Sequence, residues 1–416
     1  ISVNFEIPEN QDGQSNGHIA VKNGFMLFAD KPEVLLPDTT QSGYVKYGSE
    51  VTASQVQNAD LLYFPPGEHR LKEKFDMGVI RLTKNNQEIY IAGGAYVHGA
   101  IHGEGRDNIK IYGRGMFTGR EFVFHEIRDE NGKKDAFMNF MGSSGCHFEG
   151  FIVENPTHHT IPSSNNTYHK NFKIIGWASN HDGIRPSDGS FAEEIFIKTS
   201  DDLDYARDQH KVVRSVIWPM RNGAFGQLGW NNLGKGHTTY EDLYFINASW
   251  DVDMRQKRNQ GVIGSVLNQG VNMANDTVRN IYMEDYTAAL VNLSIKYESG
   301  DGLNLNNPGT IKNFYFENIK VENGFKLVSG YKMMQPIYGF EQNGVKAMIH
   351  DITFVNIVAG NKLVTQENHR DYFYIDDNTT FNINFQTKGD IHTLRTLSNS
   401  GGSLRPDGDI PVPDGT

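Results

Sequence analysis

The sequence predicts an all-β protein whose strands wind into a parallel β-helix, and three observations lead to this fold class. Short strands with alternating apolar residues return about every 20 to 40 residues, a period typical of solenoids, propellers or arrays. No matching helical patterns lie between them, which disfavours a doubly wound sheet. Glycine, at 43 of 416 residues, and asparagine are both abundant, and both favour tight turns.

Each recurring segment predicts one strand, because apolar residues at alternate positions put one face inward and the other outward. Most of these segments end in Asn, Asp or Gly, the residues that turns prefer. In chain order the predicted strands lie within 108–113, 147–155, 171–176, 194–200, 213–218, 242–247, 279–285, 312–318 and 351–356.

A β-propeller is the competing architecture for such a period. It needs about four strands in each unit of roughly 40 residues, and the units here share no Gly-His or Trp-Asp signature. In a parallel β-helix, residues one turn apart sit on neighbouring strands about 4.8 Å apart. We therefore expect asparagines at the turns to hydrogen-bond along the stack.

A chain of 416 residues exceeds the usual domain of about 100 to 200 residues unless the fold grows by repetition. Residues 1–60 contain prolines and hydroxyl residues that break short apolar pieces, which predicts a small β cap or the remnant of a β-sandwich domain. Residues 61–390 form the predicted β-helix. Residues 391–416 are rich in Gly, Ser, Pro and Asp and predict an extended tail.

Composition excludes several classes of protein. The net charge of -11 comes without a dense basic run, so nucleic-acid binding is not expected. Cys146 is the single cysteine, which removes disulfides and cysteine-rich zinc sites. The sequence contains no run of about 18 apolar residues, so it predicts no membrane-spanning helix. Because the chain opens at Ile1, we expect a processed or trimmed soluble protein that is secreted, extracellular or periplasmic.

Three aspartates form the strongest candidate site. Asp182 lies in the segment 176–183 (GWASNHDG), and Asp201 and Asp202 follow it by close to one solenoid turn. That spacing would gather the carboxylates on one patch of the lateral surface, provided the strand ends or bulges at the adjacent pair. Crowded like charges raise the pKa of at least one member, and an acid beside a base is what glycoside hydrolysis requires. Turn aspartates bonded to their own backbone are the alternative.

Several segments, in this order along the chain, resemble the dextranase and isopullulanase glycoside hydrolases of family 49. The resemblance covers roughly residues 60 to 300 and includes 62–67 (LYFPPG), 89–100 (IYIAGGAYVHGA), 111–119 (IYGRGMFTG), 151–156 (FIVENP), 176–183, the pair 201–202 and 216–230 (VIWPMRNGAFGQLGW). The wider clan includes the family 28 polygalacturonases. Membership implies a right-handed parallel β-helix.

The resemblance also implies an inverting hydrolase of α-glucan, with the α-1,6 bonds of dextran as the first expectation. In that family the first aspartate of the adjacent pair is favoured as the general acid, so Asp201 is the expected proton donor. Asp182 and Asp202 are then the expected residues for activating water. An inverting site holds acid and base about 6.5 to 9.5 Å apart. No metal or organic cofactor is implied, and the implied partner is a polysaccharide.

Sequence differences from other members of the clan narrow the range of expected substrates. Polygalacturonases carry Gly-His-Gly and Arg-Ile-Lys elements, whereas this chain has 226–229 (GQLG) and 294–296 (SIK), which disfavours pectin. Arg185 instead places a guanidinium near the expected site, so an anionic or sulfated polysaccharide is the alternative substrate. Family 49 enzymes also have a large N-terminal β-sandwich, and at most a fragment of one fits before residue 60. The competing functional hypothesis from another class is a noncatalytic carbohydrate-binding β-solenoid.

Residues near the aspartates supply the expected sugar contacts, since the apolar face of a pyranose packs on aromatic rings. The expected substrate-binding residues are Trp177, Asn180, His181, Arg185, Tyr205, Gln227, Trp230 and Lys296. The alternative for the tryptophans is burial in the core.

Histidines offer little sign of a metal site in the sequence. The pairs His158 with His159 and His98 with His102 could suggest a metal, but no Glu or Asp stands at a ligand-like offset from them. We expect solvated loop histidines and no bound metal. The sequence does not predict an oligomeric state.

Overall fold

The computed structural model describes residues 2–3, 25–162, 165–220, 222–229, 235–248, 260–268, 270–284, 290–296, 307–325, 335–391 and 394. These residues are almost entirely strands and turns, so the predicted all-β class is confirmed. The chain divides into two compact units, a first unit of residues 30–216 and a second unit of residues 1–29 with 217–416. No helix in the described ranges is long and apolar enough to cross a membrane.

The first unit is a parallel β-helix of short strands. One stack pairs β3, β4, β7, β10, β12, β15, β18 and the start of β21 in parallel, and a second pairs β5, β8, β11, β13, β16 and β19. Short pairs β6 with β9 and β14 with β17 add a third side. In chain order the elements are β3 (Tyr44–Lys46), α1 (Ala53–Gln57), β4 (Leu61–Phe64), β5 (Gly67–Arg70), the 3₁₀ helices η1 (Leu71–Glu73) and η2 (Asp76–Gly78), β6 (Val79–Arg81), β7 (Glu88–Ile91), β8 (Ala95–His98), β9 (Ala100–His102), β10 (Lys110–Gly113), β11 (Met116–Thr118), β12 (His147–Glu149), β13 (Ile152–Glu154), β14 (Ile161–Pro162), β15 (Tyr168–Lys170), β16 (Lys173–Ile175), β17 (Ile184–Arg185), β18 (Phe191–Glu193), β19 (Phe196–Thr199), β20 (Asp204–Tyr205) and β21 (Lys211–Pro219).

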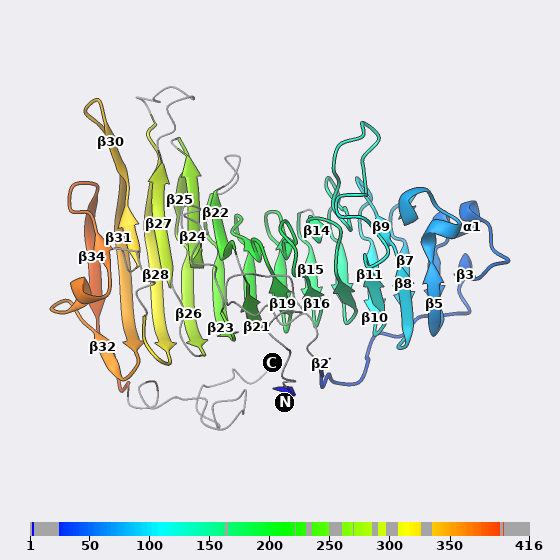
Figure 1. Ribbon diagram of the computed structural model, residues 1–416, viewed down its shortest axis with the longest axis horizontal. Coiled ribbons are helices and arrows are strands. Elements are labelled where there is room, and N and C mark those ends of the chain that lie inside the picture. Colours follow the sequence, from blue (N-terminus) through cyan, green and yellow to red (C-terminus); the bar gives the residue numbers. More distant parts are fainter. Residues whose placement is uncertain are drawn as a thin grey trace, which may run out of the picture. The chain divides into compact units, whose positions relative to one another are not determined.

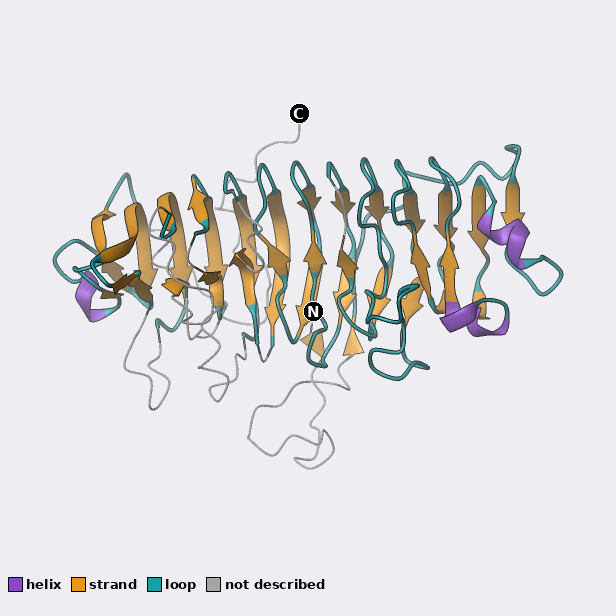
Figure 2. Ribbon diagram, turned by 90° about the horizontal axis from the view of Figure 1, so that it is seen from above, coloured by secondary structure: helices purple, strands orange, loops and turns teal. Residues whose placement is uncertain are grey.

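The second unit repeats this plan with longer strands. In it β23, β26, β28, β31 and β34 pair in parallel, as do β22, β24, β27, β29 and β33. Its elements are β1 (Ser2–Val3), β2 (Phe25–Met26), β22 (Ala224–Gly229), β23 (Thr239–Phe245), β24 (Gly261–Asn268), β25 (Asn272–Ala274), β26 (Thr277–Met283), β27 (Val291–Lys296), β28 (Thr310–Val321), β29 (Pro336–Tyr338), β30 (Phe340–Gln342), β31 (Val345–Ala359), β32 (Lys362–Val364), the 3₁₀ helix η4 (His369–Asp371), β33 (Tyr374–Ile375) and β34 (Thr380–Gln386). Within each unit, strands of successive turns lie side by side (Figures 1 and 2).

Register along the stacks puts like residues above one another. Ile111 of β10 pairs with Ile89 of β7 and Phe148 of β12, and all three are fully buried. In the second unit Phe316 stacks on Phe354, and Phe354 stacks on Phe385, with ring centroids 4.7 Å apart in each case. The core is therefore a column of apolar side chains inside the coils, which burial stabilises by about 25 cal/mol per Å² of apolar surface.

Asparagine turns hydrogen-bond along the stack, as predicted. In the second unit the amide of Asn280 donates to Asp242, that of Asn318 to Asn280 and that of Asn356 to Asn318, at 2.9 to 3.2 Å. In the first unit Asn108 donates to Asn86 at 3.0 Å. These asparagines have positive φ, a conformation that Asn tolerates better than most residues. The same asparagines thus form the turns and make the hydrogen bonds between successive turns.

The predicted strand segments each contain a strand of the structure, with one difference in detail. Segment 147–155 holds two strands, β12 and β13, separated by Gly150 at φ 88. A side chain there would overlap the carbonyl oxygen of Gly113 on the preceding turn. The predicted cap includes β3, which already pairs in parallel with β4. Most of residues 1–24 and 392–416 lies outside the described residues, so the predicted cap and tail stay predictions there.

Candidate active site

Asp182 and Asp202 are held close together by the stacking of successive turns. The backbone N–H of Gly183 donates to the carbonyl of Asp202 at 2.8 Å, and that of Ile184 donates to Leu203 at 3.0 Å. A Cβ at position 183 would overlap the carbonyl oxygen of Leu203, so only glycine allows this approach. The turn after β16 is thus fixed directly over the segment between β19 and β20.

The turn before Asp182 holds Asp201 in place. Asn180 has a φ of 58°, and its N–H donates to Oδ2 of Asp201 at 3.0 Å. Nδ1 of His181 accepts from the N–H groups of Trp177 and Ala178 at 3.2 and 3.3 Å, which closes the turn. The structure therefore connects Asp201 to the Asp182 turn through a backbone donor.

Tyr205 links the other two carboxylates. Its hydroxyl lies 2.5 Å from Oδ2 of Asp182 and 3.1 Å from Oδ2 of Asp202. All three aspartates are at most 9% exposed, so they gather as expected but in a buried cluster rather than on an open lateral surface. Asp182 does not enter the apolar core, because its carboxylate faces Tyr205 and Asp202.

Burial raises the pKa of Asp182 well above its usual value, and the charges of Asp202 and Asp201 raise it further. The hydrogen bond from Tyr205 and the charge of Arg185 oppose this shift. Oδ1 of Asp182 is buried and accepts no hydrogen bond among the described residues. Asp182 therefore retains its proton to higher pH than an exposed aspartate does, whereas the resemblance favours Asp201 as the acid.

A row of rings leads from the surface to Asp182. Phe124 stacks on His125 at 3.7 Å between centroids, His125 contacts His158 at 4.6 Å, and His158 stacks on His159 at 4.1 Å. Nε2 of His159 is then 3.6 Å from Oδ2 of Asp182. Burial lowers the pKa of His159 to about 4, so this ring is neutral near pH 7.

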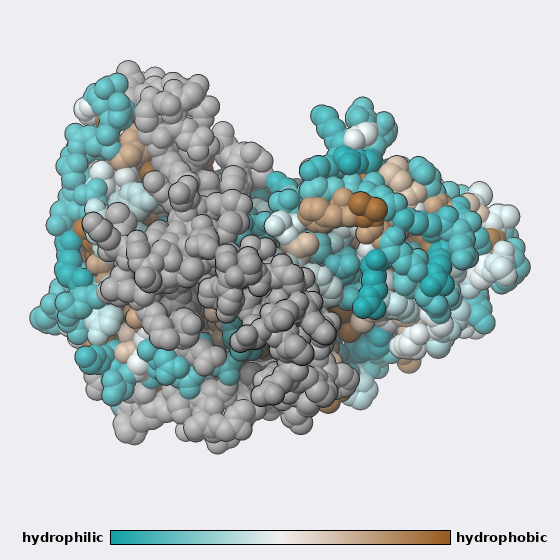
Figure 3. Space-filling model, viewed as in Figure 1, coloured by the Kyte–Doolittle hydropathy of each residue, from teal (hydrophilic) through white to brown (hydrophobic). Residues whose placement is uncertain are grey.

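These rings were not expected near the aspartates. His158 and His159 are partly buried and stacked, not solvated loop residues. Phe124 lies in the irregular segment between β11 and β12, which has no period to place it. Phe124 is 42% exposed and Val123 is 75% exposed. Figure 3 shows hydrophobic residues gathered on an otherwise mostly hydrophilic surface of the first unit.

The expected sugar contacts of the first unit differ in accessibility. Trp177, Asn180 and Arg185 are partly exposed, whereas His181 and Tyr205 are buried. The guanidinium of Arg185 lies 5.3 Å from the ring centroid of Tyr205. In the structure His181 closes the turn before Asp182, and Tyr205 bridges the carboxylates of Asp182 and Asp202.

The remaining expected contacts belong to the second unit. Gln227 is buried in β22, and Lys296 is the last residue of β27. Trp230 lies outside the described residues. Contact of these three with substrate remains a prediction.

Comparisons with known proteins agree with this architecture. No protein-family model matches the chain. The chain is 25% identical over 244 residues to a curated dextranase of Talaromyces minioluteus, a match that covers 52% of this chain and 39% of that protein. The chain therefore spans about two fifths of that relative's length.

Two solved structures share the fold. Dex49A from Penicillium minioluteum matches with a TM-score of 0.69 and 19% identity, over 85% of this chain and 65% of that one. The family 28 exopolygalacturonase of Yersinia enterocolitica matches with a TM-score of 0.51 and 14% identity, over 84% and 76%. The right-handed parallel β-helix is confirmed, as is the resemblance to family 49 within the polygalacturonase-like clan.

Proposed function

We propose that the chain is a glycoside hydrolase that cleaves a polysaccharide at the cluster of Asp182, Asp201 and Asp202. The observation that carries this proposal is the hydroxyl of Tyr205 within hydrogen-bond distance of both Asp182 and Asp202, with Asp201 held beside them by Asn180. Crowded carboxyl groups with separated proton affinities are what acid and base catalysis of glycoside hydrolysis needs. The likeness to a curated dextranase supports the same reaction class.

The proposed substrate is an α-glucan, first dextran with its α-1,6 bonds, cleaved internally with inversion. Asp201 donates the proton to the leaving oxygen, as the resemblance implies. A proton retained on Asp182 leaves Asp202 as the ionised base that activates water. The hydroxyl of Tyr205 lies within hydrogen-bond distance of both groups and holds them beside each other. An enzyme of this kind acts outside the cell, in keeping with the expected secretion.

An anionic or sulfated polysaccharide is the second candidate, because Arg185 stands beside the cluster. The guanidinium of Arg185 already has contacts inside the protein, since its Nη1 lies 3.5 Å from Nδ1 of His159 and its carbon lies 5.3 Å from the ring centroid of Tyr205. This internal role favours the neutral glucan. A noncatalytic carbohydrate-binding β-solenoid is the rival from another class, and it predicts binding without turnover.

The experiment is a reducing-end assay on dextran, pullulan, pectin and a sulfated galactan. Dextran cleavage by the wild-type chain, lost in Asp201→Asn, is the expected result. Cleavage of only the sulfated galactan or pectin, falling steeply with added salt, would transfer the proposal to the anionic substrate, since salt screens charge recognition. Binding to a glycan with no cleavage of any polymer would favour the noncatalytic rival.

A further inference from the structure

His102 has a neutral ring with one nitrogen fixed by backbone carbonyls and the other facing polar side chains. Nε2 lies 3.1 Å from the carbonyl oxygen of Ala136 and 3.2 Å from that of Phe137. A carbonyl only accepts, so Nε2 carries the hydrogen and Nδ1 presents a lone pair. Burial lowers the pKa of His102 to about 4, which keeps the ring neutral near pH 7.

Two carboxylates converge on that nitrogen. Oδ2 of Asp135 lies 3.6 Å from Nδ1 of His102, and Oε2 of Glu104 lies 4.0 Å from it. The amide of Asn139 donates to Oδ1 of Asp135 at 2.8 Å and to Oε1 of Glu104 at 2.7 Å. One side chain thus orients both carboxylates and leaves their other oxygens facing His102, the kind of outer support that metal ligands have.

One of the facing oxygens has no hydrogen-bond partner. Asp135 is 8% exposed, and its Oδ2 is buried without a hydrogen bond among the described residues. Leaving a buried carboxylate oxygen unpaired is costly. We propose that His102, Glu104 and Asp135 bind one divalent cation of the Zn²⁺ class, through Nδ1 and one oxygen of each carboxylate, with water completing the shell.

The donor set suits that class of ion. Zn²⁺ is commonly bound by imidazole nitrogen together with carboxylate oxygens, whereas Mg²⁺ and Ca²⁺ prefer oxygen alone. The three ligand atoms already lie within 4.8 Å of one another. Small side-chain shifts bring them to the roughly 2.0 to 2.2 Å at which Zn²⁺ is bound.

Arg81 competes with the ion. Its Nη1 lies 3.1 Å from Nδ1 of His102 and 3.8 Å from Oε2 of Glu104. The side chain is 43% exposed, so it can withdraw into solvent when a cation takes its place. Removing this guanidinium should therefore strengthen cation binding.

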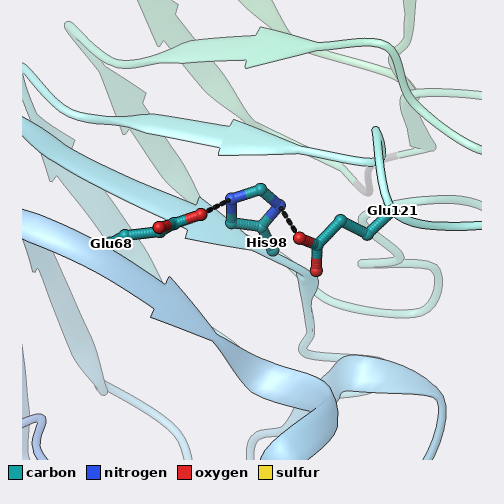
Figure 4. Close-up of side chains that lie close together, drawn as sticks. All are labelled: Glu68, His98 and Glu121. Carbon is teal, nitrogen blue, oxygen red and sulfur yellow. Dashed lines mark ion pairs between the residues drawn. The ribbon is translucent and has the colours of Figure 1, made fainter.

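A second histidine cluster provides the contrast (Figure 4). Nε2 of His98 lies 2.9 Å from Glu68, and Nδ1 lies 3.5 Å from Glu121. The ligand atoms of this cluster also lie within 4.8 Å of one another, but the two carboxylates face opposite ring nitrogens and do not converge on one lone pair. Arg70 also forms ion pairs with both glutamates. This cluster forms an ion-pair network and serves as a control.

The proposed ion connects two parts of the first unit. His102 ends β9, and Asp135 lies in the segment between β11 and β12 that also carries Phe124 and His125. The bound ion would fix this segment against the coil. The inference is independent of the proposed function, because binding is read by heat and thermal stability and not by turnover.

The experiment is calorimetric titration of Zn²⁺ into the full chain after treatment with EDTA and desalting. The expected result is one ion per chain for wild type, binding at least tenfold weaker in Asp135→Asn and Glu104→Gln, and tighter binding in Arg81→Met. Glu121→Gln and Glu130→Gln are matched controls that should bind as wild type does. Zn²⁺ should raise the Tm of wild type but not that of Asp135→Asn.

Absence of stoichiometric Zn²⁺ binding in the folded wild type would overturn the inference. So would equal affinity in wild type, Asp135→Asn and Glu104→Gln. Binding that persists in Asp135→Asn but disappears in His159→Gln would assign the ion to the candidate active site and also contradict the proposal. Circular dichroism of each variant verifies that the chain is folded.

Discussion

The hydroxyl of Tyr205 lies 2.5 Å from Oδ2 of Asp182. The hydroxyl oxygen of Tyr205 is also 3.1 Å from Oδ2 of Asp202, yet a hydroxyl has only one hydrogen to donate. Two ionised carboxylates cannot both be satisfied by it. A proton on Asp182 removes the conflict, and burial beside two other aspartates supplies the reason for its raised pKa.

Tyr205→Phe keeps the ring and removes the bridge. We expect kcat to fall about tenfold or more, with KM little changed, since general acid and base contributions are about 10² to 10⁴ and part of the positioning remains. Because Asp182 is proposed to act with its proton retained, loss of that proton sets the basic limb of the pH profile. The Tyr205 hydrogen bond lowers the pKa of Asp182, so removing it moves the basic limb to higher pH. The measurement is kcat/KM against pH. A lower yield of folded protein with an unshifted limb would indicate a structural role alone.

Asp201→Asn removes the proposed proton donor. The expected loss in kcat is about 10² to 10⁴ with the fold intact, because a positioned acid contributes about that much. Asp76→Asn, at an exposed aspartate of the same unit, is the matched control and should turn over as wild type does. Initial rates on dextran measure both, and wild-type rates in Asp201→Asn would remove this residue from the mechanism.

Asp182→Asn should stabilise the protein at high pH. Folding raises the pKa of Asp182. The stability that Asp182 contributes is therefore fully present at a pH below its pKa in the unfolded chain, and it is lost as pH rises through its pKa in the folded protein. The variant should gain on the order of 1 kcal/mol in free energy of unfolding at pH 8 and little near pH 4. Denaturant unfolding at both values tests this. A variant less stable than wild type at pH 8 would contradict this prediction, because it would mean that the folded protein stabilises the ionised carboxylate of Asp182.

Phe124→Ala tests the exposed ring at the end of the histidine row. If sugar stacks on it, an aromatic contact of about 0.5 to 1.5 kcal/mol is lost and KM rises about two- to tenfold. Phe381 is also exposed and stacks on a histidine, His350, at 4.4 Å, so Phe381→Ala is a matched control. Steady-state kinetics on dextran should separate the two variants, and equal KM values would count against the stacking role.

The strands and turns were predictable because their causes are local and repeated. Alternating side chains define each strand, and an asparagine such as Asn318 can adopt positive φ and also bond to the next turn. The gathering of Asp182 with Asp201 and Asp202 followed from their spacing of nearly one turn. Gly183 then makes the contact between those turns close.

Burial and long-range contacts were not predictable in the same way. The burial of the three aspartates depends on what packs over them, and the position of Phe124 depends on an irregular segment. Glu104 stands two residues after His102 in the sequence, but the group is complete only with Asp135 from beyond β11. Neither strand periodicity nor turn composition brings those residues together.

The most direct test of the central claim is time-resolved proton NMR of the first products that the wild-type chain releases from dextran. The expected result is internal cleavage of α-1,6 bonds with the new reducing end appearing first as the β anomer, because a single displacement inverts the α bond. Release of the α anomer first, or no cleavage of dextran by folded protein, would contradict it.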